Sequence, residues 1–163
     1  MVAVSNRVIH RHLGSRLLSE AYSFLENDIE TQSYLKMANI MAVKRLGYND
    51  HGPVHAKIIA GSALEIFSLL TNTVEPSSVM NGVCDYDDAK LIVLLGAYLH
   101  DVGNSIHRID HEKTGALLSS NLLDRLLLEL YDNDPGLSYR IKSEVLHTLY
   151  SSNDSIPCLS VEA

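Results

Sequence analysis

The chain has 163 residues, a net charge of −7 and a hydrophobic content of 46%. This length fits a single domain with a substantial core, and the apolar content excludes a mainly disordered chain. The acidic balance argues against binding to a nucleic-acid duplex, because domains of that kind usually carry a basic patch.

The sequence predicts a soluble cytoplasmic protein without a membrane span. The best candidate for a membrane span, 89–99, is shorter than the ~20 residues that a membrane-spanning helix needs. The first twenty residues contain three arginines and no continuous apolar segment, which argues against a secretory signal. Cys84 and Cys158 do not form a disulfide framework and are expected to be free thiols in a reducing compartment.

Helical periodicity dominates the chain, and no strand alternation of useful length appears before the C-terminal tail. The first two predicted helices span about 7–25 and 28–46, and Gly47 is expected to stop the second. A turn-rich linker, 47–53, follows. Pro53 suits the first turn of a third helix that runs to about Leu70. The face of this helix that is expected to be apolar comprises His55, Ile58, Ile59, Ser62, Ile66 and Leu69.

A fourth helix, 89–99, is apolar nearly all round and is expected to lie at the centre of the domain. Segment 71–86 is predicted to be a loop, and the acidic residues 85–88 suit the start of the fourth helix. Gly103 is expected to end this helix, and Asp110 to cap a fifth helix, 111–131. A sixth is predicted over 135–150. The expected fold is all-α, with about six helices in one domain over 1–163.

The C-terminal segment 158–163 has the character of the opening of another element, without a cap or a polar trailing stretch. We therefore expect the chain to be truncated at its C-terminus.

Two adjacent ionisable residues, His100 and Asp101, close the apolar fourth helix. Burying them without a partner would be unfavourable by several kcal/mol. A divalent cation would bind both a neutral imidazole nitrogen and an anionic oxygen. The alternative is an ordinary helix C-terminus with a hydrogen-bonded histidine and an exposed aspartate.

His51 and His55 are separated by one helical turn, within the region that holds five of the eight histidines. Pro53 favours a loop position for His51. A lone histidine such as His55 on an apolar face is usually a hydrogen-bonded core residue. His55 becomes a candidate ligand because His100 and Asp101 also point toward the core.

The stretch from Tyr48 to Pro157 resembles the HD domain of metal-dependent phosphohydrolases. Residues 99–103, Leu-His-Asp-Val-Gly, are similar to the family signature L-H-D-[IV]-G. Residues 48–56 resemble its first motif, in which a histidine one turn ahead precedes the ligand histidine. Cyclic-nucleotide phosphodiesterases share the H-x-x-x-H-A spacing. The resemblance implies an HD-domain-like helical bundle that holds one or two divalent metals and cleaves phosphate esters.

The resemblance implies a set of metal ligands. His55, His100 and Asp101 match the first metal site, and His111 and His147 match the extra histidines used for a second metal. Periodicity leaves His147 facing either a polar site or solvent. Such a ligand set fits Mn, Fe, Ni, Zn or Co, or Mg where water completes the shell.

The sequence departs from the family pattern at two places. The family usually completes its first site with an aspartate from a later helix, whereas here the acids after His147 are Asp154, in a serine-rich loop, and Glu162. Either Asp154 substitutes or the ligand lies beyond Ala163, and we favour the second. Asn104 stands where the family often has a phosphate-binding lysine.

The implied reaction is attack of a metal-activated water on a phosphoester, in a nucleotide-like small substrate. Asp101 is the candidate bridging ligand. His51 or His107 could protonate the leaving oxygen, and the resemblance favours His51. Candidate substrate contacts are Asn104, Arg108 and Lys113, whereas Lys57 is interpreted as a solvated charge. A homodimer remains open.

Motifs of several other enzyme classes are absent, including G-x-x-x-x-G-K-[ST], G-x-G-x-x-G and G-x-S-x-G. The competing interpretation is a non-catalytic helical module that binds a nucleotide or a protein and keeps a degenerate metal site. Metal content distinguishes the two, because such a module should purify without stoichiometric metal.

Overall fold

The computed structural model describes residues 5, 7–153 and 156–163, and within these ranges the chain is helical without any strand. This confirms the all-α prediction. The α-helices are α1 (Arg16–Asn27), α2 (Ile29–Asn39), α3 (Pro53–Leu70), α4 (Ser77–Met80), α5 (Tyr86–Leu99), α6 (His111–Leu130) and α7 (Pro135–Ser151). Shorter segments are the 3₁₀ turns η1 (Val8–Arg11) and η3 (Val102–Ser105) and the π-helical turn η2 (Ile40–Arg45).

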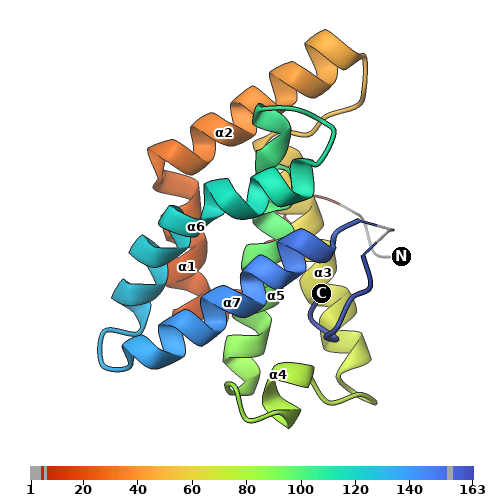
Figure 1. Ribbon diagram of the computed structural model, residues 1–163. Helices are drawn as coiled ribbons and strands as arrows, with labels where there is room; N and C mark the ends of the chain where they lie inside the picture. Colours follow the sequence, from red (N-terminus) through yellow and green to blue (C-terminus); the bar gives the residue numbers. More distant parts are fainter. Residues whose placement is uncertain (1–4, 6, 154–155) are drawn as a thin grey trace.

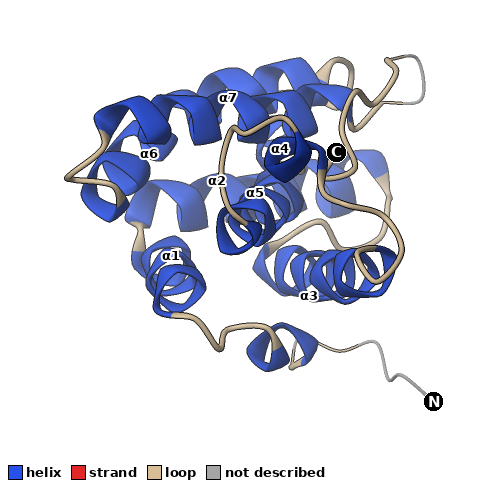
Figure 2. Ribbon diagram, turned by 90° about the horizontal axis from the view of Figure 1, so that it is seen from below, coloured by secondary structure: helices blue, strands red, loops and turns tan. Residues whose placement is uncertain are grey.

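The helices cross in two sets. The axes of helices α1, α5 and α3 are roughly aligned, with α5 between the other two and α3 antiparallel to it, while α2, α6 and α7 cross them (Figure 1). Figure 2 views α1, α5 and α3 close to end-on and shows α6 and α7 lying across them. Helix α5 therefore packs against α1, α3 and α7 at once.

Helix α5 forms the centre of the core, as its uniform apolarity predicts. Ala89, residues 91–95, Tyr98 and Leu99 are each at most 5% exposed. The helix begins at Tyr86, because Asp85 and Asp88 form a capping box. The Asp85 carboxylate accepts the backbone N–H of Asp88, and the Asp88 carboxylate accepts the backbone N–H of Asp85. The prediction of acidic residues at the start of this helix is thus confirmed. At the other end of α5, Tyr98 and Leu99 are buried.

The buried face of α3 differs from the predicted one. Its buried residues are Ala56, Ala60, Gly61, Leu64 and Phe67, whereas Ile66 and Leu69 are more than half exposed. Part of this face consists of small residues because η1 packs closely on it: a Cβ on Gly61 would lie 2.6 Å from the backbone nitrogen of Ile9. The size and apolarity of the side chains alone therefore predicted the wrong face of α3 as the buried one.

The N-terminal predictions need two corrections. The helix predicted over 7–25 is interrupted after η1, and α1 begins only where the Ser15 side chain accepts the Leu18 N–H. The second predicted helix is α2 followed by the π-helical turn η2. Gly47, at φ 72°, follows that turn and confirms the predicted stop.

Two local predictions around the site are wrong. Gly103 does not break the chain, because it lies within η3; a Cβ there would lie 1.9 Å from the His111 carbonyl oxygen, so glycine permits close packing of η3 on α6. Asp110 precedes α6 in a left-handed conformation at φ 56° without capping it through its side chain. The predicted loop 71–86 also contains the short helix α4.

The C-terminal residues 156–163 form neither helix nor strand. Glu162 is buried, and its carboxylate accepts the Ser77 and Ser78 backbone N–H groups at 3.3 and 2.9 Å. These bonds hold the segment against α4. Its role as the opening of another element stays a prediction.

By length and composition α3 would also be able to cross a membrane. In the fold, however, its Lys57 pairs with Glu26 and its Glu65 with His12. Insertion into a bilayer would break both pairs and place two charges in hydrocarbon, which is strongly unfavourable. The fold is compatible with a soluble protein, and the cytoplasmic location stays a prediction.

Candidate metal centre

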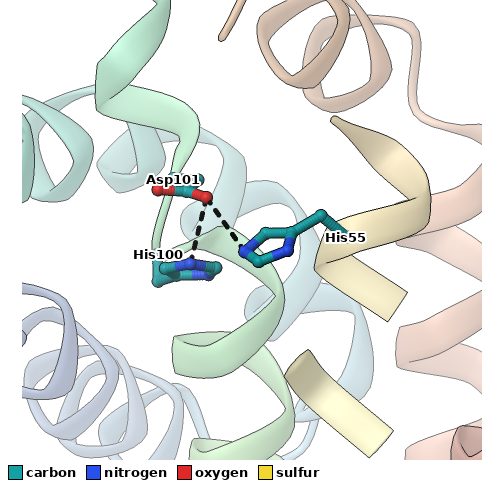
Figure 3. A group of neighbouring side chains, drawn as sticks. All are labelled: His55, His100 and Asp101. Carbon is teal, nitrogen blue, oxygen red and sulfur yellow. Dashed lines mark ion pairs between the residues drawn. The ribbon is translucent and has the colours of Figure 1, made fainter. Parts of the chain in front are cut away.

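Two helices that pack on each other bring three candidate ligands together. His55 lies in the first turn of α3, and His100 and Asp101 directly follow α5. The Nε2 atoms of His55 and His100 lie 3.4 and 3.1 Å from the same oxygen, Oδ2 of Asp101. Figure 3 shows both rings directed at this carboxylate. The structure thus places the three predicted first-site ligands in one group.

The hydrogen bonding of His100 leaves its Nε2 lone pair free. Its Nδ1 lies 2.9 Å from the Ala97 carbonyl oxygen, so Nδ1 carries the proton of the neutral ring. Asp101 is only 2% exposed. Its Oδ2, which faces His100, has no hydrogen-bond partner among the described residues. Two lone pairs therefore face each other in a buried place, which is unfavourable without a positive charge between them.

The distances fit ligands of one metal ion. Ligand atoms at about 2.1 Å from a metal lie roughly 3.0 to 3.4 Å apart for angles between octahedral and tetrahedral. The 3.1 and 3.4 Å separations at Oδ2 fall in this range. One proton could bridge only one pair of atoms, whereas a divalent cation would satisfy both imidazoles and the carboxylate. The three residues therefore fit a metal ion, and the structure does not distinguish which metal.

The second carboxylate oxygen of Asp101 is held from the opposite side. Oδ1 accepts the Asn104 side-chain N–H at 2.6 Å, and Asn104 Oδ1 in turn accepts from Arg108 Nη1 at 3.2 Å. His111 Nε2 lies 4.0 Å from the same Oδ1. Asn104 is buried and contacts Asp101 and Arg108, so in this arrangement it orients the ligand.

Burial and neighbouring groups shift the pKa values of the site. Burial lowers the pKa of His55, against the opposing charge of Asp101, and so favours the neutral imidazole that binds metals. For Asp101 burial acts to raise the pKa, but the interaction with the adjacent His100, and to a smaller degree those with His51 and His55, outweigh it and hold the pKa below its usual range. The ligand group therefore favours one anionic oxygen with neutral imidazole nitrogen.

The ligand group opens into a polar cavity of about 440 Å³. A cavity of this size suits a small molecule. The residues that line it are His51, His55, His100, Asp101, Arg108, His111, Glu112, Ser152 and Asn153.

Among the predicted acid–base residues, His51 lies at the cavity and His107 does not line it. His51 is in the loop before α3, where its Nδ1–H donates to the Asn49 carbonyl at 2.8 Å and its ring stacks on that of His55 at 5.3 Å. His107 is exposed, and its Nδ1 accepts the Ile109 N–H. Lys113, a predicted substrate contact, instead pairs with Asp110 at 2.8 Å.

His111 lies at the cavity with a neighbour that sequence reasoning missed. Its Nδ1–H faces the Arg108 carbonyl oxygen at 3.0 Å and Glu112 Oε1 at 3.2 Å. Burial, together with the Arg108 charge, lowers the pKa of His111. Glu112 is buried and lines the cavity, although an acid in the first turn of a helix ordinarily indicates only a favourable interaction with the helix dipole.

His147 is not part of the group formed by His55, His100 and Asp101. His147 Nε2 accepts the Leu159 N–H at 3.1 Å and its Nδ1 lies 3.2 Å from Ser151 Oγ, so both ring nitrogens are already hydrogen-bonded. Asp154 lies outside the described residues, although Ser152 and Asn153 just before it line the cavity. The second-metal role of His147 and the ligand role of Asp154 stay predictions.

Comparison with known proteins finds a similar protein in an archaeon. No family model and no solved structure matches the chain. It is 42% identical over 143 residues to an uncharacterized protein, MJ1020, of Methanocaldococcus jannaschii. The match covers 87% of this chain and 54% of that protein, so the chain spans about half the length of the curated relative. The name of this relative states no activity.

Proposed function

We propose that this chain is an HD-domain-like, metal-dependent phosphohydrolase that acts on a small phosphorylated substrate. The observation that supports the proposal most strongly is the buried Oδ2 of Asp101, without a hydrogen-bond donor and facing the Nε2 atoms of two histidines. The resemblance of residues 99–103 to the family signature independently selects two of these residues.

In this proposal His55, His100 and Asp101 hold the metal. A bound divalent metal lowers the pKa of its water and polarises a phosphoryl oxygen. Asn104 keeps Asp101 in place through the hydrogen bond to Oδ1, which leaves Oδ2 for the ion. The Nδ1–H bond to Ala97 keeps the Nε2 atom of His100 in the ligand orientation.

Two further residues are placed to act on a substrate in the cavity. The fixed Nδ1–H of His51 makes Nε2 the atom that would carry a proton to the leaving oxygen. Arg108 lines the cavity, and its side-chain contacts with Asn104, His111 and Asp101 all involve Nη1. Its Nε and Nη2 groups are therefore the donors with which it would bind a phosphate oxygen.

The competing proposal is a non-catalytic nucleotide- or protein-binding module. It draws support from Asn104, which replaces the family's frequent lysine and is buried away from the cavity. An assay for substrate turnover distinguishes the binding module from the enzyme.

The test is hydrolysis of p-nitrophenyl phosphate and bis(p-nitrophenyl) phosphate by protein purified without chelator. We expect Mn²⁺-dependent release of p-nitrophenol that EDTA abolishes and added Mn²⁺ restores. Asp101→Asn removes the anionic charge with little change in shape and should abolish turnover.

Lys113→Ala serves as the matched control. It removes a positive charge near the cavity, and in the structure this charge pairs with Asp110. Its turnover should equal that of wild type. Absence of hydrolysis of every member of a panel of phosphate mono- and diesters, in protein that also purifies without stoichiometric metal, would contradict the enzyme and favour the binding module.

A further inference from the structure

We propose that Arg108 takes the place of a second cation, so that the site holds one metal ion and the guanidinium group supplies the other positive charge. This inference rests on the proposed metal site and concerns the number of ions it binds. It assigns to Arg108 a position beside the metal in addition to any contact with substrate.

Three acceptor atoms from different residues surround Arg108 Nη1. It lies 3.2 Å from Asn104 Oδ1, 3.2 Å from His111 Nε2 and 3.9 Å from Asp101 Oδ1. An amide oxygen, an imidazole nitrogen and a carboxylate oxygen together are the ligand types that a divalent cation would bind. The same atoms here converge on a permanently charged nitrogen.

The tautomer of His111 shows that its Nε2 is an acceptor in this arrangement. Its Nδ1 faces the Arg108 carbonyl oxygen and Glu112 Oε1, both acceptors, so the ring proton lies on Nδ1. The Nε2 lone pair is then directed at Arg108 Nη1. A metal ion at His111 would have to displace the guanidinium, because both would use the same lone pair.

The two carboxylate oxygens of Asp101 consequently divide between two cations. Oδ2 faces the His55 and His100 imidazoles, and Oδ1 faces Asn104, Arg108 and His111. The carboxylate would bridge two metals if Arg108 were absent. With Arg108 present it bridges one metal position and one guanidinium, whose charge remains fixed at any physiological pH.

The test counts Mn²⁺ ions in wild type and in Arg108→Ala, by titrating metal-free protein and following free Mn²⁺ by electron paramagnetic resonance. We expect about one ion per chain in wild type and about two in Arg108→Ala, since the freed acceptors form a second position of the kind found in two-metal sites. Adding His111→Ala to Arg108→Ala should return the count to about one.

Two further variants keep the test decisive. Arg108→Lys retains a positive charge near the acceptors and should stay at about one ion, which also serves if Arg108→Ala folds poorly. Lys113→Ala removes an exposed charge nearby and should also stay at about one. Two ions in wild type, or one ion in folded Arg108→Ala, would overturn the inference while leaving the metal site intact. Absence of Mn²⁺ from wild type would contradict the metal site itself and with it this inference.

Discussion

The Nε2 atom of His100 lies 3.1 Å from Oδ2 of Asp101 while the Nδ1–H of the same ring is bonded to the Ala97 carbonyl. The backbone of α5 thereby determines which imidazole nitrogen faces the carboxylate. Because the two residues are adjacent, the end of one buried helix supplies two ligand atoms of different charge. The third, on His55, comes from the neighbouring helix α3.

Replacing His100 with alanine should weaken Mn²⁺ binding by at least 100-fold, because loss of even an outer partner of a metal ligand lowers affinity by about 10- to 100-fold. The matched control is His107→Ala, an exposed histidine nearby that contacts its own loop. Isothermal titration calorimetry with Mn²⁺ measures both. Equal affinities for the two variants would exclude His100 as a ligand.

Replacing Asn104 with leucine should destabilise the fold by about 1–3 kcal/mol, because Asp101 Oδ1 loses a buried hydrogen-bond donor. Mn²⁺ affinity should fall as well, since Asp101 is less firmly oriented. Asn133→Leu is the control: Asn133 also donates to an aspartate at 2.6 Å, but on the surface. Urea denaturation that gives the same stability loss for both variants would contradict the orienting role.

Substituting Gly103 with alanine should destabilise the protein by about 1–3 kcal/mol or more, because the added Cβ would lie 1.9 Å from the His111 carbonyl oxygen. The resulting shift of α6 should also move His111 away from Asp101. Gly14→Ala, where a Cβ would meet nothing within 4 Å, should leave the melting temperature nearly unchanged. A Gly103→Ala protein with wild-type stability would show that η3 and α6 are not packed this closely.

Substituting Leu94 with aspartate should be unfavourable by several kcal/mol, since Leu94 is fully buried in α5 and the new charge would have no partner. Leu117→Asp, at a position that is 77% exposed, is the matched control and should change stability little. Chemical denaturation checks both. A Leu94→Asp protein as stable as Leu117→Asp would contradict the central position of α5.

The two cysteines should differ in how their alkylation depends on pH. Burial raises the pKa of Cys84 to about 11, so below that pH its thiol is mostly protonated and unreactive. Cys158 is exposed. At about pH 8, iodoacetamide should therefore modify Cys158 well before Cys84. The rate of Cys84 alkylation should increase as the pH rises toward 11. Mass spectrometry of the digested protein would reveal equal rates if Cys84 were freely accessible.

The sequence was sufficient for the features that depend on local pattern. The uniform apolarity of residues 89–99 predicted a central helix, and the adjacent His100 and Asp101 predicted ligands at its end. The turn residues before Pro53 correctly placed His51 in a loop. These features follow from side-chain polarity and backbone preferences along a short segment.

Features that depend on how helices meet were not predictable in the same way. The buried face of α3 is set by the close approach of η1 to Gly61, so Ile66 and Leu69 lie on the exposed side. Glu112 lines the cavity because η3 packs on α6, and His147 accepts a hydrogen bond from Leu159, in the segment that follows α7. No periodicity encodes such contacts between distant segments.

An anomalous difference map from crystals grown with Mn²⁺ tests the metal centre most directly. The structure predicts a strong peak within bonding distance, about 2.0–2.2 Å, of Nε2 of His55, Nε2 of His100 and Oδ2 of Asp101. A well-ordered structure that shows the three side chains in this arrangement with no peak between them, at saturating Mn²⁺, would contradict the account.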